Sequence, residues 1–475
     1  MVKVRFFRAK NTGLILKILA VLMLIAGITV YGIEKVDDMN GPEPGDPKSL
    51  NDYNDFNVDF GAGEKLLAGE DIYFQPTSPE GRYFLYPPVY AIYMSMVVKL
   101  GLRGGAIYWF LSNATMLIIS VFLTTQLLTK DRYIRMKLAI LGIIITGRFI
   151  DSDLGNGNVN LHVLFFLSLG LWCLAKNRSF WGGFSFGLAA LTKVTPIIYI
   201  GYLSWKVLTS WNRSRQSLST DMAARQYDPF KFWSRALAGM IASLILFTAV
   251  VPSLFLGWET NRQLHRDFYV SMVKPYARIS GHPAKYWQSG YSLKSVLIHY
   301  FSDTTKFDSE RKKDHVNVAN LSPQTIWLMY LTITIVLVGF SLFAWQRHLV
   351  DQIPIDWGPL LLALEIGSVA ALMVTISPLS RKAHYVVLLI PVLASLSSGF
   401  NLPVQLPQKL KKLLIGGAVF VGIIGIGTSR DVVGRQLFTY LVYGHRVLFW
   451  TSFIIWMSCT IALIRVRYSE SHRNG

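Results

Sequence analysis

The sequence predicts an all-α integral-membrane protein, a bundle of about twelve transmembrane helices, and three observations lead to this fold class. Of the 475 residues, 52% are hydrophobic and only 16% are charged, whereas soluble domains carry roughly 25% charged residues. Apolar runs near the ~20 residues that span a bilayer recur from end to end, and a transmembrane barrel would instead show alternating segments of about ten residues. Lys and Arg gather in short loops between these runs.

The basic residues also predict the orientation of the chain. The positive-inside rule accounts for the net charge of +19, because the basic residues lie in the loops between spans. The charge therefore does not indicate a nucleic-acid partner. Four basic side chains precede the first apolar run: Lys3, Arg5, Arg8 and Lys10. They place the N-terminus in the cytoplasm, and we interpret 14–33 as an uncleaved first span, because no small-residue cleavage site precedes Glu34. We expect one catalytic domain, 1–475, in the plasma (inner) membrane, with both ends cytoplasmic.

Residues 34–86 are the first extracytoplasmic loop. It begins with a Pro/Gly linker at 41–48, and 60–73 is typical of a short helix that stops near Gly69. Three carboxylates stand between them, in a chain that is otherwise poor in acids: Asp52, Asp55 and Asp59. We expect these acids on a loop just outside the first span, and a loop imposes no periodicity that would choose among them.

The length of the apolar run at 87–101 does not show whether it crosses the membrane. At about 15 residues it is either a tilted span or a helix at the outer interface. The next run, 105–128, is followed by basic residues at 130–137, which are cytoplasmic only if 87–101 does not cross the membrane. The charge distribution therefore favours an interfacial helix.

The remaining spans follow by alternation. We expect them at about 138–150, 158–175, 180–192, 194–210, 236–257, 325–346, 358–376, 384–400, 412–428 and 445–465. This alternation leaves one large extracytoplasmic loop, 258–324, and keeps the basic loops inside.

On this topology, every stretch with unusual polar or Gly/Pro chemistry lies outside. The stretches are 52–56, 83–88, 151–160, 191–196, 286–293 and 377–385. Taken singly, 191–196 and 377–380 are equally consistent with ordinary helix ends, and 155–160 with a turn. Taken together, they indicate one extracytoplasmic active site built from several loops near the membrane surface.

Two charged residues interrupt apolar sequence. Lys193 lies between Leu188 and Tyr202, where an ammonium group is costly unless it is paired or near water. At the outer rim it would suit an anionic phosphate head group. Glu365 lies inside another apolar run, and we expect it to be paired within the bundle and not catalytic.

The chain resembles the integral-membrane glycosyltransferases of the GT-C class, and within them glycosyltransferase family 87, which includes polyprenyl-phosphate-mannose-dependent mannosyltransferases. The matching stretches occur in family order: "NDFNVDFGAGEKLLAGEDIY", "YFLYPPVYAIYM", "GNGNVNLHVLFFLSLGLW", "GGFSFGLAALTKVTP", "SGYSLKSVLIHY" and "SPLSRKAHYVVLLIP". They extend from about Asp52 to Pro391. The resemblance implies a GT-C fold.

The resemblance also implies roles for residues. Asp55 matches the family's general base, and the donor phosphate is expected near Lys193 and the 377–385 segment. Two departures bear on donor and acceptor: the chain has Asn158 where the family often has Gln, and Arg381 where it often has Trp. A single histidine replaces a pair of histidines in the same segment. The substrate-binding candidates are Asp52, Asp59, Tyr86, Asn158, Asn160, Lys193, Ser289, Ser380, Arg381 and His384.

The predicted function is transfer of a hexose, mannose by resemblance, from a polyprenyl-phosphate sugar to an extracytoplasmic glycan or glycolipid. The leaving group is already good, so transfer needs a base for the acceptor hydroxyl and cations for the phosphate, and in-line attack inverts the anomeric centre. We expect no cofactor, no metal and no nucleic acid; the partners are the lipid-linked donor, the acceptor and membrane lipid.

Two other functions compete with this prediction. A polytopic transporter or flippase would also have many spans, but it would usually show repeats with matched broken helices, which this sequence lacks. A membrane-bound hydrolase or metal enzyme would need clustered ligands. The candidate ligands His265, His282 and His299 are dispersed, and Cys173 and Cys459 lie inside apolar runs.

Overall fold

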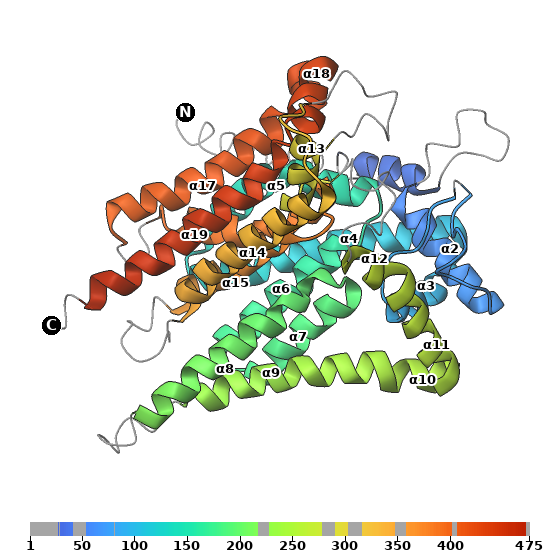
Figure 1. Cartoon of the computed structure of the whole chain (residues 1–475), viewed down its shortest axis with the longest axis horizontal. Coiled ribbons are helices and arrows are strands. Elements are labelled where there is room, and N and C mark those ends of the chain that lie inside the picture. The colour runs from blue at the N-terminus through green and yellow to red at the C-terminus, as the bar shows by residue number, and fades with distance from the viewer. Residues whose placement is uncertain are drawn as a thin grey trace, which may run out of the picture.

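The computed structural model describes residues 27, 29–40, 54–79, 81–216, 228–277, 290–302, 316–346, 358–400 and 406–471, without the side chains of 213–216, 276–277 and 467–471. Every regular element among these residues is a helix, which confirms the predicted all-α class. The long helices lie alongside one another, and the short helices α2, α3, α11 and α12 gather at one end (Figure 1).

The body of the protein is a bundle of helices. They are α4 (Gly101–Leu128), α5 (Arg132–Gly155), α6 (Asn160–Ala175), α7 (Ser179–Thr192), α8 (Ile198–Gln216), α9 (Pro229–Ile245), α14 (Pro323–Trp345), α15 (Gly358–Ile376), α16 (Leu389–Ser397), α17 (Gln408–Gly427) and α19 (Leu448–Ser471). A π-helical turn, η5 (Leu246–Val250), continues α9 into α10 (Val251–Leu256), and a 3₁₀ helix, η11 (Lys382–Leu388), precedes α16. Among the described residues, six helices are long and apolar enough to cross a membrane, so the chain is a multi-pass membrane protein.

Short helices cover one end of the bundle. α2 (Asp55–Ala68) ends at Gly69, whose φ of 72° closes the helix in the left-handed conformation, as the sequence predicts. α3 (Pro88–Val98) has 11 residues, about half of what a span requires, and it packs against α2. The other short helices are η2 (Thr195–Ile197), α11 (Trp258–Phe268), η6 (Tyr269–Val273), α12 (Lys274–Ala277), α13 (Leu293–Phe301), α18 (Arg430–Phe438) and η12 (Thr439–Gly444).

The helix α5 is longer than the 138–150 run that hydropathy predicts. Asp131 caps it, and its carboxylate accepts hydrogen bonds from two amides of the first turn. The helix then continues to Gly155 through polar residues that an apolar run does not include. Its last turn therefore brings Asp151 and Asp153 to the end of the bundle where α2 and α3 lie.

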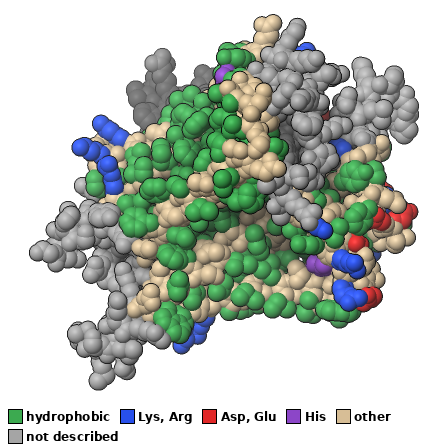
Figure 2. Space-filling model, in the orientation of Figure 1, with side chains coloured by type: hydrophobic (Ala, Val, Ile, Leu, Met, Phe, Trp, Pro, Cys, Tyr) green, Lys and Arg blue, Asp and Glu red, His purple; other side chains and the backbone are tan. Residues whose placement is uncertain are grey.

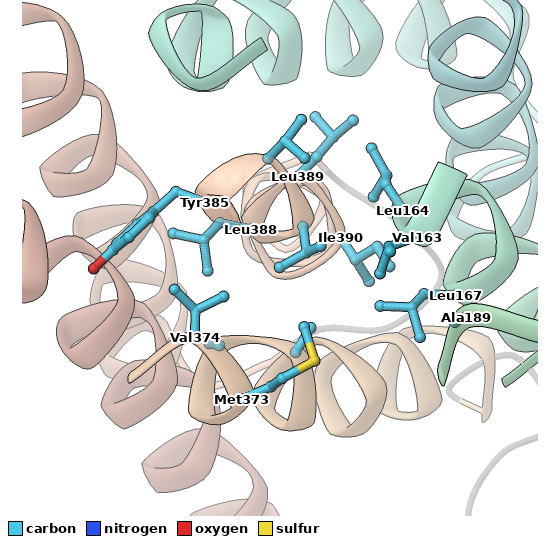
Figure 3. Packing of buried hydrophobic residues seen from close by; sticks show 14 of the residues in the cluster. Val163, Leu164, Leu167, Ala189, Met373, Val374, Tyr385, Leu388, Leu389 and Ile390 are labelled. Carbon is cyan, nitrogen blue, oxygen red and sulfur yellow. The ribbon is translucent and has the colours of Figure 1, made fainter. Parts of the chain in front are cut away.

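The centre of the bundle is α15, whose residues from Leu360 to Thr375 are all buried. Side chains of α6, α15 and α16 meet there, among them Leu164, Met373 and Ile390 (Figure 3). Close approach of helices elsewhere depends on small residues: a Cβ on Gly183 of α7 would lie 1.6 Å from the carbonyl oxygen of Ala236 in α9.

A buried ion pair holds α8 to α15. Lys206 Nζ lies 2.9 Å from a carboxylate oxygen of Glu365, and both side chains are fully buried. The hydroxyl of Tyr202 donates to the same carboxylate, and Lys206 also donates to the carbonyl oxygen of Trp345. The expectation that Glu365 is paired within the bundle is confirmed.

Charged side chains are concentrated at the two ends of the bundle. On the face in Figure 2, hydrophobic side chains cover the middle, Lys and Arg appear at both ends, and Asp and Glu appear at the right end beside α2 and α11. A hydrophobic middle with charged side chains at both ends is typical of a membrane protein.

Candidate active site

A cavity of about 520 Å³ opens at the end of the bundle covered by α2 and α3. Its lining comes from segments far apart in the sequence. The polar lining residues are Asp55, Asp59, Arg82, Tyr83, Tyr86, Asn158, Lys193, Thr195, Ser377, Arg381 and His384. The apolar lining residues are Val58, Leu85, Val194, Ile197, Ile198, Phe268, Met272, Val273, Met373, Ile376, Pro378 and Leu379. Such a cavity suits a ligand with a polar head and an apolar tail.

The two acids that line this cavity lie on a helix. The expected loop is wrong for Asp55 and Asp59, because α2 begins at Asp55. Asn54 caps the helix in a reciprocal capping box with Asn57. Residues four apart lie on one face of a helix, so both carboxylates point to the same side.

The loop between α5 and α6 holds the start of α2 in place. The amide of Phe56 donates to the carbonyl oxygen of Asn156, at 3.2 Å. Gly157 has a φ of 59°, and a Cβ there would lie 2.5 Å from the Cβ of Phe56. This close approach explains why glycine stands in the 155–160 stretch and how that stretch determines the position of Asp55.

Asp55 lies between two arginines. Its carboxylate forms an ion pair with Arg82, and a guanidinium nitrogen of Arg381 lies 3.9 Å from the same oxygen. All three side chains are partly exposed to the cavity. The charges favour the ionised form of Asp55, which is the form that accepts a proton.

Asp59 is in a different environment one turn later. It is 1% exposed, and one oxygen, Oδ2, accepts a hydrogen bond from the hydroxyl of Tyr90 at 2.9 Å. The other oxygen, Oδ1, has no hydrogen-bond partner among the described residues. Burial raises the pKa of Asp59 well above its ordinary value, while Tyr90 and Lys193 act in the opposite direction.

Lys193 immediately follows α7 at the floor of the cavity. Its Nζ lies 2.7 Å from Asn160 Oδ1 and 2.7 Å from His384 Nε2, and 5.7 Å from the centre of the Tyr86 ring. Burial lowers the pKa of Lys193 to about 7, although the nearby carboxylate of Asp153 raises it. Glu365 is the partner of Lys206, so Lys193 is held by neutral side chains and not by that buried acid.

Asp153 supports this floor from below. The Asn160 side-chain amide donates to Asp153 Oδ1 at 2.7 Å, and the amide of Leu161 donates to Oδ2 at 3.2 Å. Asp153 is fully buried, so the chain Asp153–Asn160–Lys193 is a continuous polar connection within the protein.

The 377–385 segment forms the opposite wall. Arg381 and His384 face the cavity, whereas Ser380 lies behind it and lines a small adjoining pocket of about 10 Å³ with Asn160. The hydroxyl of Ser380 donates to the carbonyl oxygen of Val374. Ser380 therefore holds the backbone of the segment and does not contact the main cavity.

The structure thus brings together most of the residues that the sequence singled out. Asp55, Asp59, Tyr86, Asn158, Lys193, Arg381 and His384 line one cavity, and Asn160 and Ser380 stand directly behind it. Asp52 and Ser289 lie outside the described residues. Three further residues of the site were not predicted: Arg82, Tyr90 and Asp153. All three lie within or beside stretches that the sequence predicts to be on the outer face.

Three comparisons with known proteins bear on this site. The model of glycosyltransferase family 87 matches residues 84–378, more than half of the 475-residue chain. Asp55 and Arg381 lie outside that range. The chain is similar in structure to a crystal structure of ArnT from Cupriavidus metallidurans bound to undecaprenyl phosphate, with 14% identity, a TM-score of 0.41, and coverage of 93% of this chain and 76% of that chain. None of the curated proteins matches the chain in sequence.

Proposed function

The chain belongs to glycosyltransferase family 87, and from this premise we propose that it transfers a hexose, mannose, from a polyprenyl-phosphate-linked donor to an extracytoplasmic glycan or glycolipid. The observation that carries this proposal is the composition of the cavity. A carboxylate, Asp55, lies beside cationic side chains, and an apolar surface adjoins them. These are the groups that a sugar, a phosphate and a prenyl chain require.

The donor phosphate is assigned to Lys193 and Arg381. A phosphate that leaves the anomeric carbon gains negative charge, and fixed cations lower the barrier by stabilising that charge. Both side chains line the cavity, and Lys193 is held in position by Asn160 and His384. The Nε atom of Arg381 is buried and has no hydrogen-bond partner among the described residues, so its hydrogen-bonding capacity is unused in the structure.

Asp55 is assigned as the general base. It would accept the proton of the acceptor hydroxyl as that oxygen attacks the anomeric carbon, with inversion, while the bond from that carbon to the phosphate oxygen breaks. In the structure the carboxylate is paired with Arg82. The donor phosphate and the acceptor must therefore either bind while the Arg82–Asp55 ion pair stays intact or break that ion pair.

The prenyl chain is assigned to the apolar side of the cavity. Val194 and Ile197 line the cavity and are 39% and 43% exposed. Exposed aliphatic side chains at this point offer an apolar surface to which a lipid tail can bind.

The experiment that tests the function uses cells that lack the protein and then the purified protein. A glycan or glycolipid lacking one hexose should accumulate in the cells. The purified protein should convert that species with polyprenyl-phosphate-mannose and not with a nucleotide sugar. Transfer from a nucleotide sugar alone would overturn the donor assignment, and transfer of another hexose would overturn mannose.

The extracytoplasmic location of the site is tested by thiol labelling. Asn320 and Lys130 are exposed at opposite ends of the bundle, at the ends where α14 begins and α4 ends, and the native cysteines are buried. A membrane-impermeant reagent should label Asn320→Cys in intact cells and leave Lys130→Cys unlabelled. The reverse pattern would place the cavity in the cytoplasm.

A further inference from the structure

Among the described residues that line the cavity, Asp59 is the one acid that the proposed reaction does not use. It lies on the same face of α2 as Asp55, but its surroundings are opposite in character. Asp55 is partly exposed between guanidinium groups, whereas Asp59 is 1% exposed and makes no ion pair that the described residues reveal. An unpaired buried carboxylate is costly in its charged form, and the cost is avoided when the group binds a proton.

The hydrogen bond from Tyr90 indicates which oxygen carries that proton. The tyrosine hydroxyl donates to Oδ2, so Oδ2 acts as an acceptor. The proton of a neutral carboxyl then belongs on Oδ1, the oxygen without a partner among the described residues. Asp59 lines the cavity and its Oδ1 is buried in the cavity wall, so an O–H on Oδ1 is within reach only of a ligand that packs closely against that wall.

Resting on the proposed function, we propose that Asp59 is a neutral carboxylic acid whose Oδ1 donates a hydrogen bond to an oxygen of the sugar-phosphate head group of the donor. The ligand oxygen is a sugar hydroxyl or a phosphate oxygen, both of which accept such a bond. Asp59 would therefore bind and orient the donor and would take no proton from the acceptor. A buried carboxyl that stays protonated to serve as a hydrogen-bond donor is an established way to stabilise an oxyanion.

The charged and titratable groups around Asp59 are consistent with this assignment. Lys193 and the hydroxyls of Tyr86 and Tyr90 face it from the segments packed against α2. Burial outweighs the favourable charge of Lys193 and raises the pKa of the Asp59 carboxyl. A phosphate bound to Lys193 would neutralise that charge and favour the protonated carboxyl still more.

The test compares Asp59→Asn with Asp59→Leu in the full-length protein in nanodiscs. Asparagine is neutral and can donate from its amide, so we expect donor affinity and turnover within about threefold of the parent. Leucine has a similar size and no donor, so we expect donor affinity to fall by roughly tenfold, as for loss of one hydrogen bond. If Asp59→Asn is as inactive as Asp55→Asn, or if Asp59→Leu binds as well as the parent, the proposal is wrong.

Binding of two different lipids shows which oxygen of the donor accepts the hydrogen bond from Asp59. Binding is measured with polyprenyl-phosphate-mannose and with polyprenyl phosphate. A loss in Asp59→Leu for the mannosylated lipid alone assigns the bond to a sugar hydroxyl, and a loss for both assigns it to the phosphate. The parent is the reference in each measurement: if the parent neither binds nor transfers, the proposed function fails, and Asp59 is not the cause.

Discussion

Lys206 is buried in the bundle and Lys193 is partly buried at the cavity, and the partners of these two lysines differ. Lys206 pairs with Glu365, and the same carboxylate accepts a hydrogen bond from Tyr202. Lys193 has no carboxylate within ion-pair distance among the described residues; its nearest partners are the neutral groups of Asn160 and His384. The first lysine is neutralised by the protein itself, and the second leaves its charge available.

The same difference extends to the atoms around each lysine. Buried polar atoms in native proteins are nearly always hydrogen-bonded, so an unsatisfied one requires an explanation. No side-chain atom of the Lys206–Glu365 network is unsatisfied, whereas Asp59 Oδ1 and Arg381 Nε at the cavity are, among the described residues. A closed network stabilises the fold, and an open one at a cavity indicates where a ligand supplies the missing partners.

The largest expected effect concerns the carboxylate assigned as base. Asp55→Asn keeps the shape of the side chain and removes its basicity, so turnover should fall about 10²–10⁴-fold, with donor binding nearly unchanged. Asp52→Asn and Asp59→Asn should cost much less. The measurement is mannose transfer and donor binding by the purified variants. Near-parental transfer by Asp55→Asn, with an inactive variant at either neighbour, would show that the base is misassigned.

The next prediction tests whether Lys206 and Glu365 neutralise each other inside the bundle. Lys206→Met leaves Glu365 buried without its cation, and the free energy of unfolding should fall by about 3–5 kcal/mol. The double variant Lys206→Met/Glu365→Leu removes both charges and should recover most of that loss. Chemical unfolding in detergent measures both. If the double variant is as unstable as the single one, charge compensation is not the role of Glu365.

A smaller effect is expected at the cavity lysine. Lys193→Met removes one charge-assisted hydrogen bond to the phosphate, so donor affinity should fall about 10–100-fold while acceptor affinity and folding stay close to the parent. Binding of polyprenyl-phosphate-mannose and of the acceptor measures the two affinities separately. Unchanged donor affinity would make Lys193 a structural residue like Lys206.

The smallest effect is a pH dependence of donor binding. The pKa of Lys193 is about 7 in the empty site, and the groups that face it are Asp153, Arg381, Asp59 and His384. The anionic donor favours the charged lysine, so binding takes up a proton and affinity should fall about tenfold from pH 6 to pH 8. Lys193→Arg stays charged throughout. It should show a flat profile, and an equally steep one would assign the pH dependence to another group.

Much of the fold could be predicted from hydropathy and charge, because both determine how a helix lies in a membrane. The end of α2 at Gly69 followed from the conformational preference of glycine, and the short α3 from the length of its apolar run and the charges that follow the next run. The extent of α5 did not, since its ends are polar and a helix cap depends on a single side chain, Asp131. The start of α2 at Asp55 was missed for the same reason, because its cap is Asn54.

The site could be predicted only as a set of residues. Polar residues confined to the outer face identified most of the cavity lining, and Asp55 was selected by resemblance. Partners could not be predicted, because Arg82 lies 27 residues from Asp55 and only the fold brings them together. Asp153 lies seven residues from Asn160, yet it was missed because the sequence does not show that α5 extends to it.

The shortness of α6 and α7 has a consequence for the membrane around the cavity. They have 16 and 14 residues, so they are about 24 and 21 Å long, against a hydrocarbon thickness of ~30 Å. We expect the bilayer to thin locally beside them. Asn160 begins α6 and Lys193 follows α7, so we expect the floor of the cavity to lie below the surrounding membrane surface. A phosphate anchored by a prenyl chain can reach that floor without leaving its leaflet, whereas the acceptor has to descend to it. The rate of transfer should therefore depend on the thickness of the host bilayer as well as on the concentrations of the substrates.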